Sequence, residues 1–97
     1  MECCYVIYSA SLNRFYIGRS SKGALQRVNE HNGKEYGLGK FTAKATDWKL
    51  VITLECEDPK HSQKVEAHIK RMKSRKYIQN LVEYPELRQR LIAKHRS

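Results

Sequence analysis

Two short β-prone runs near the N-terminus lie so close together that they restrict what the chain can fold into. Residues 3–8 and 15–18 are mostly apolar or aromatic, and the six residues between them, "SASLNR", are mostly small or polar. Runs of this kind bounded by turn residues are typical of strands. Strands joined by such a short connection pair most simply as an antiparallel hairpin. The pattern therefore predicts a β-hairpin at the start of the fold.

The residues that follow the hairpin predict a first helix, which ends near residue 32. Ser20 or Ser21 can cap its start, because a serine hydroxyl accepts a hydrogen bond from a free amide of the first turn. The apolar residues are spaced as the buried stripe of an amphipathic helix. This stripe consists of Ala24, Leu25 and Val28.

Arg27 and His31 lie four residues apart on this helix, so they stand one above the other at an edge of its apolar stripe. From this edge they can face the hairpin and still reach solvent. We expect the hairpin to bring the phenols of Tyr8 and Tyr16 beside them. Each residue also has an ordinary structural explanation, since strand tyrosines usually pack and a histidine near a helix end can stabilise that end.

The middle of the chain predicts a long loop and then a third strand. Residues 33–47 hold three of the five glycines together with polar residues. Lysines interleaved with aromatic residues, here Lys40 and Lys44, suit a loop that grips a nucleic-acid backbone, although a plain surface connection remains the alternative. Residues 48–56 alternate as a strand. We expect one apolar face on this strand, formed by Leu50, Ile52 and Leu54.

The last part of the chain predicts three helices. Asp58 can cap the first of them, and Pro59 suits its first position. Glu66 lies on the flank of this helix and can pair with a lysine four residues later. A short helix covers about residues 76–82, and a final amphipathic helix begins at Pro85. The buried stripe expected for the first of these helices is Val65, Ile69 and Met72.

These elements predict a single α+β domain over residues 1–97. Their order is β-β-α-β-α-α with an extra C-terminal helix, and three strands with helices against them form packed layers. The core of the domain covers about residues 3–82, and the extra helix about residues 85–95. The length of 97 residues also favours one domain.

Charge and cysteine content narrow the class of function. The net charge of +9 on this short chain points to a polyanionic partner, most often nucleic acid. Three cysteines, two of them adjacent, favour reduced thiols in the cytoplasm over a disulfide framework. The apolar runs are too short to span a membrane, and no basic segment precedes the first of them as in a secretory signal.

The residues singled out above include the kinds of group that phosphodiester hydrolysis needs. A carboxylate can hold Mg²⁺, an arginine matches phosphate oxygens with its planar fork, and a tyrosine or histidine can take the proton of water. A free phenol is a poor base at neutral pH, but nearby cations such as Arg19 and Arg27 favour the phenolate.

The arrangement of these residues resembles the GIY-YIG nuclease superfamily. The tripeptide "VIY" ends at Tyr8 and "YIG" begins at Tyr16; Arg27, His31 and Glu66 then follow at matching places. The resemblance covers roughly residues 4–81. The segment from Lys40 to Lys76 resembles small stand-alone bacterial members, which are similar to the N-terminal nuclease domain of the excision-repair incision subunit and to the Holliday-junction-processing relatives. One departure is a valine where the family name has its first glycine.

The resemblance implies a central three-stranded antiparallel sheet and a nuclease that uses one divalent ion, Mg²⁺ or Mn²⁺. Glu66 would hold the metal, Arg27 would stabilise the charge on phosphorus, and His31 would assist. Tyr8 and Tyr16 would position or deprotonate the water, with either as the base. A further set of basic residues would contact the nucleic acid: Arg19, Lys40, Lys44, Lys70, Arg75 and Lys76.

The function expected from the sequence is therefore a metal-dependent endonuclease of duplex or branched DNA, acting in repair or recombination. Two other classes stay open. One is a non-catalytic, basic DNA-binding module with the same fold, because the chain carries no separate DNA-reading segment. The other is a protein-interaction domain that uses its C-terminal helix. The sequence also leaves open a homodimer or a protein partner.

Overall fold

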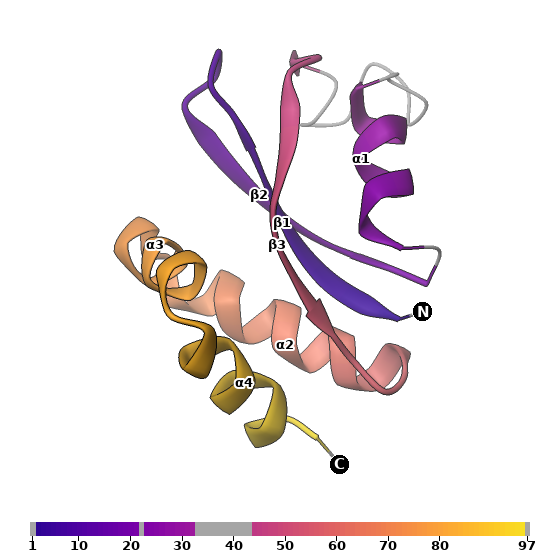
Figure 1. Cartoon of the computed structure of the whole chain (residues 1–97), viewed down its shortest axis with the longest axis vertical. Coiled ribbons are helices and arrows are strands. Elements are labelled where there is room, and N and C mark those ends of the chain that lie inside the picture. The colour runs from indigo at the N-terminus through magenta and orange to yellow at the C-terminus, as the bar shows by residue number, and fades with distance from the viewer. Residues whose placement is uncertain (1, 22, 33–43, 97) are drawn as a thin grey trace.

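The computed structural model of the chain describes residues 2–21, 23–32 and 44–96 (Figure 1). Most of the expected loop, including Lys40, lies outside these residues. So do four side chains of the first helix, although its backbone is described: Leu25, Arg27, Glu30 and His31.

The element order confirms the expected α+β fold, with three strands and a C-terminal helix. In chain order the elements are β1 (Cys3–Ser9), β2 (Arg14–Ser20), α1 (Ala24–Asn32), β3 (Trp48–Glu55), α2 (Pro59–Met72), α3 (Arg75–Glu83) and α4 (Pro85–Lys94). The first helix begins later than the sequence indicated, because β2 continues through Ser20 instead of ending at Gly18.

The sheet has the order β2-β1-β3, and both strand pairs are antiparallel. The expected hairpin is therefore confirmed, and β1 forms the centre of the sheet. Helix α1 covers one face, while α2, α3 and α4 lie on the other (Figure 1). Side chains alternate between these faces along β1. Tyr5 and Ile7 pack on the α1 side, whereas Cys4 and Val6 pack on the α2 side.

The expectation that Leu50, Ile52 and Leu54 share one face of β3 is wrong, because the strand contains a β-bulge. Val6 pairs with Ile52, but the next residue, Ile7, pairs with Leu50, so Val51 is an extra residue in the ladder. Leu50 therefore packs on the α1 side, and Ile52 packs on the other. The regular alternation fails because a bulge adds one residue to one strand only and re-aims the side chains beyond it.

Two contacts position α1 and α4 against the rest of the fold. The Asn32 side chain at the end of α1 accepts a hydrogen bond from the Trp48 amide (2.7 Å) and donates one to the Trp48 carbonyl (2.9 Å). On α2, the buried His61 accepts from the Glu57 amide through Nδ1 (3.0 Å), which leaves Nε2 to donate to the Ile92 carbonyl of α4 (2.8 Å).

Helix α2 begins as expected, since the Asp58 carboxylate accepts a hydrogen bond from the His61 amide and Pro59 follows it. Its buried stripe is only partly as expected. Val65 and Ile69 are buried, but Met72 is exposed, because the helix ends there and turns at Lys73 in the left-handed conformation.

Candidate active site

A hollow of about 350 Å³ lies at the outer edge of β2, where the sheet has no further strand. An edge strand lets side chains from both faces of a sheet reach one space. The hollow therefore brings residues of β2 together with residues of α2 and of the N-terminus. It is lined by Glu2, Tyr16, Gly18, Arg19, Ser20, Ser21, Pro59 and Glu66.

Glu66 is the carboxylate that α2 presents to this hollow. Its side chain keeps only 18% of its exposure and is held by two cations. Arg19 Nε donates to Oε1 at 3.1 Å, and Lys70 Nζ lies 3.4 Å from Oε2. The expected pair with Lys70 is therefore present. The Arg19 guanidinium is thus directed to this carboxylate. It balances the negative charge of Glu66, which is the only acidic residue of α2.

Tyr16 faces the α1 side of the sheet and shares that side with Tyr5. In the hairpin, Ile7 pairs with Tyr16 and Tyr5 pairs with Gly18, so both phenols belong to the same face. Tyr16 is half-buried and its ring lies 6.4 Å from that of Trp48. Tyr5 is fully buried. Among the described residues, the phenols on the α1 side of the sheet are those of Tyr5 and Tyr16.

The ring of Tyr5 lies directly over Gly18. A methyl group on Gly18 would lie 2.5 Å from the Tyr5 hydroxyl oxygen and 2.6 Å from the ring carbon that carries it. The glycine of "YIG" is therefore the residue that makes room for this phenol. Sequence reasoning missed Tyr5, because its position on the face of Tyr16 depends on the register of the hairpin.

The expectation that Tyr8 lies with Tyr16 beside α1 is wrong. Tyr8 pairs with Phe15 in the hairpin and faces the opposite side of the sheet, where the Arg75 guanidinium lies 5.8 Å from its ring centre. Its hydroxyl donates to Asn13 Oδ1 at 2.6 Å. The cause is the register, since adjacent strand positions point to opposite faces and a shift of one residue exchanges them.

The remaining expected residues lie in several places. The backbone of α1 places Arg27 and His31 four residues apart on the helix that covers the Tyr16 side of the sheet, as expected. Lys44 precedes β3 and is exposed. Arg75 and Lys76 start α3, and both are exposed on the side of the sheet opposite α1.

The family model described as the GIY-YIG catalytic domain matches residues 1–79 of the chain. The chain belongs to the GIY-YIG family. It therefore carries a nuclease-type domain, for which DNA is the implied substrate. No curated protein and no solved structure matched the chain. None of the described helices is long and apolar enough to cross a membrane.

GIY-YIG nucleases are generally dependent on a divalent metal, and the residues at the β2 edge fit such an ion. The described residues contain no group of three or more metal-binding side chains. However, Mg²⁺ keeps several waters and needs only one or two protein carboxylates besides phosphate oxygens. Glu66 supplies one carboxylate, and Glu2 brings a second to the same hollow. The lysine partner of Glu66 is 52% exposed and free to turn toward solvent.

Proposed function

We propose that this GIY-YIG domain is a divalent-metal-dependent endonuclease that hydrolyses phosphodiester bonds of DNA at the β2 edge. The observation that carries the proposal is the meeting of Glu66, Tyr16 and Arg19 in one open hollow. The net charge of +9 supports a polyanionic substrate. We further propose that it cuts branched DNA during repair or recombination in the cytoplasm, where its free, buried thiols would stay reduced.

In this proposal Glu66 holds Mg²⁺ or Mn²⁺, which when bound polarises a phosphate oxygen and neutralises charge on the leaving group. Arg19 offers its guanidinium to the same phosphate once the metal takes over the carboxylate. Arg27 of α1 has the chemistry to stabilise the charge that develops on phosphorus, and His31 to assist proton transfer.

Tyr16 is the phenol that we assign to the attacking water, because it lines the hollow and is half-buried. Its hydroxyl can orient the water, and its phenolate can accept the proton of the water. We assign the supporting role to Tyr5 instead of Tyr8. Tyr5 lies on the Tyr16 side of the sheet and is fully buried, so it packs beneath the site with its position fixed by Gly18.

One observation favours a second candidate function, a DNA-binding domain without catalysis. Both carboxylate oxygens of Glu66 are engaged by cations. A metal must therefore compete with Arg19 and Lys70 for the only carboxylate that α2 offers to the hollow. If that competition fails, the same surface still binds DNA through its basic residues.

The two functions are separated by a cleavage assay on labelled duplex, flap and four-way-junction DNA with Mg²⁺, Mn²⁺ or EDTA. We expect metal-dependent cutting by the wild type, and a loss of at least about a hundredfold in Glu66→Gln, which removes the metal ligand. Glu83→Gln is the matched control, because Glu83 is an exposed carboxylate at the end of α3.

Thermal unfolding of Glu66→Gln shows whether the variant is folded, since it also removes the charge that pairs with Arg19 and Lys70. Cutting by a folded Glu66→Gln at the wild-type rate contradicts the metal role. DNA binding without cutting in either metal supports the second function.

A further inference from the structure

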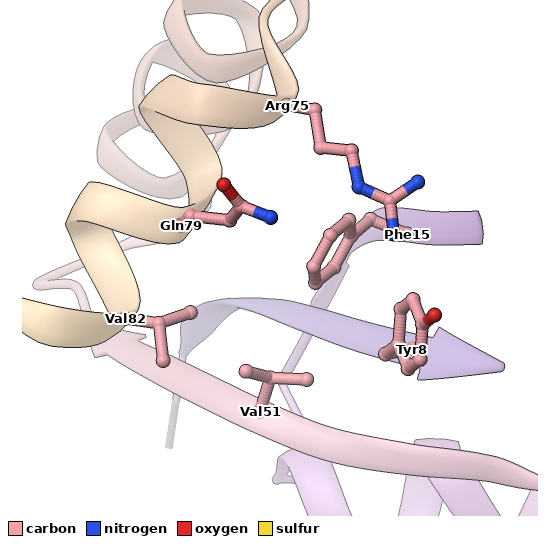
Figure 2. Close-up of a pocket in the computed structure, with 6 residues that line it drawn as sticks. All are labelled: Tyr8, Phe15, Val51, Arg75, Gln79 and Val82. Atoms are coloured by element: carbon pink, nitrogen blue, oxygen red, sulfur yellow. The ribbon is translucent and has the colours of Figure 1, made fainter. Parts of the chain in front are cut away.

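A second hollow of about 350 Å³ lies on the face of the sheet opposite α1, between the strands and α3 (Figure 2). Its size falls within the usual range of small-molecule sites. Aromatic rings and aliphatic side chains form most of its wall, and α3 adds two polar groups. The lining residues are Tyr8, Phe15, Val51, Arg75, Gln79 and Val82.

The aromatic wall is held rigidly. The ring centres of Tyr8 and Phe15 are 4.8 Å apart, and the Arg75 guanidinium lies 5.3 Å from the Phe15 ring centre. Asn13 at the hairpin turn ties this group together. Its Oδ1 accepts from the Tyr8 hydroxyl and from Arg75, both at 2.6 Å, and its carbonyl accepts a further Arg75 bond at 3.1 Å. Rings fixed in advance lose little entropy when a planar ligand stacks on them.

The opposite wall combines the β3 bulge with α3. The bulge directs Val51 to the side of Tyr8, and Val82, which is 37% exposed, faces it from α3 (Figure 2). Gln79 points from α3 toward the Phe15 ring (Figure 2), and the described residues give its amide no hydrogen-bond partner. An amide is both a donor and an acceptor, so it can bond the edge of a flat heteroaromatic ring.

A cationic path joins this hollow to the candidate active site. A neighbouring hollow shares Phe15 and Arg75 with it and adds Arg14, Lys70 and Lys73. Among the described residues, no Asp or Glu lines either space. Lys70 is the residue that also pairs with Glu66. From Glu66 to Lys73 the helix rises about 10 Å. This path is short, so a strand that follows it reaches the hollow within a few nucleotides.

We propose that the hollow of Figure 2 binds one unpaired base of a DNA strand whose backbone follows the cationic path from the β2 edge. The inference rests on the proposed nuclease function and names its substrate class. Stacking on aromatic and arginine planes, with an amide at the base edge, is how proteins hold unstacked bases. A base inside a duplex cannot enter, because it is stacked and paired. The site therefore selects flaps and frayed ends, and Tyr8 acts in binding.

The first test uses wild-type protein in EDTA, so that cutting does not interfere, and flap DNA that carries 2-aminopurine at one strand position at a time. We expect strong fluorescence quenching at a single unpaired position, within a few nucleotides of the position that is cut when Mg²⁺ is added. Equal quenching at every position, or none at any, overturns the proposal, and this result needs no variant.

The second test measures flap and duplex affinity of Val82→Phe, which fills the hollow without a change of charge. We expect flap binding to weaken about tenfold, the scale of one lost base stack, and duplex binding to stay unchanged. Gln89→Phe adds the same ring at an exposed position of α4 that does not line the hollow, and it is the matched control, with an expected change below about twofold. Circular dichroism confirms that both variants are folded, which is favoured by the exposure of Val82.

The outcomes also separate this inference from the proposed nuclease function. If the wild type binds and cuts DNA but Val82→Phe binds flaps normally, only the base site is wrong. If the wild type binds no DNA, both are wrong. If Val82→Phe leaves all DNA binding intact but abolishes binding of a protein partner, the hollow is a protein-docking site and the base proposal fails.

Discussion

The contact between Tyr5 and Gly18 yields a prediction whose magnitude follows from the structure. In Gly18→Ala the new methyl group meets the Tyr5 hydroxyl oxygen at 2.5 Å and two ring carbons at 2.6 and 3.1 Å. The ring cannot swing into solvent, because Tyr5 is fully buried in the centre of the sheet. Either the ring or the β2 backbone must move.

Overpacking of this kind costs about 1–3 kcal/mol. Replacing glycine in a strand interior by alanine returns roughly 0.5–1 kcal/mol of backbone entropy. A contact of 2.5 Å with a buried ring is severe, so we place the cost in the upper part of the first range and expect the free energy of unfolding to fall by about 1–2.5 kcal/mol in Gly18→Ala. Urea unfolding followed by circular dichroism measures this change.

A double-mutant cycle with Tyr5→Leu tests the cause. Leucine removes the atoms that meet the new methyl group, so the two substitutions together should cost less than the sum of the single ones, by about 1 kcal/mol or more. Gly23→Ala is the control, because Gly23 has a φ of +100° and open space around it. Its cost is backbone strain and should not depend on Tyr5. A Gly18→Ala protein as stable as the wild type would refute the reasoning.

Three further outcomes follow from described contacts. Asp58→Ala removes the cap that accepts from the His61 amide at 2.7 Å and should cost about 1 kcal/mol in urea unfolding. Leu81→Ala empties a fully buried core position and should lower the free energy of unfolding by about 2–5 kcal/mol. Burial lowers the pKa of His68, and burial followed by the charge of His68 lowers the pKa of His95. The unfolded chain therefore binds more protons below about pH 6.5, and stability should fall as the pH is lowered through that value toward 5. This fall in stability should be smaller in the double variant His68→Asn/His95→Asn. Urea unfolding midpoints measured at a series of pH values test the difference.

Local sequence patterns were sufficient to predict most of the elements. The β-prone runs, the cap at Asp58 and the apolar stripe through Val65 and Ile69 each depend on residues a few positions apart. These preferences act within one element, so they hold wherever that element packs. The motif residues also led to the correct family, and Glu66 lies at the hollow as its flanking position on α2 indicated.

The partners of the tyrosines depended on the register of the hairpin. Ser9 pairs with Arg14, so four residues form the turn, and Asn13 adopts a left-handed φ of 53° there. The turn segment "SASLNR" is compatible with other loop lengths, and a register shifted by one residue would exchange the faces of Tyr8 and Tyr16 relative to each other. Burial of Tyr5 over Gly18 favours the observed register.

The bulge at Val51 and the meeting of Arg19 with Glu66 are likewise tertiary results. Arg19 and Glu66 are 47 residues apart in the chain and meet only because α2 packs along β2. Spacing within an element shows which residues share a face. Pairing between strands and packing between layers decide what each face contacts, because those energies come from residues far apart in the sequence. The residue types of the candidate site were therefore readable from the sequence, whereas the fold decided which tyrosine shares a face with Tyr16.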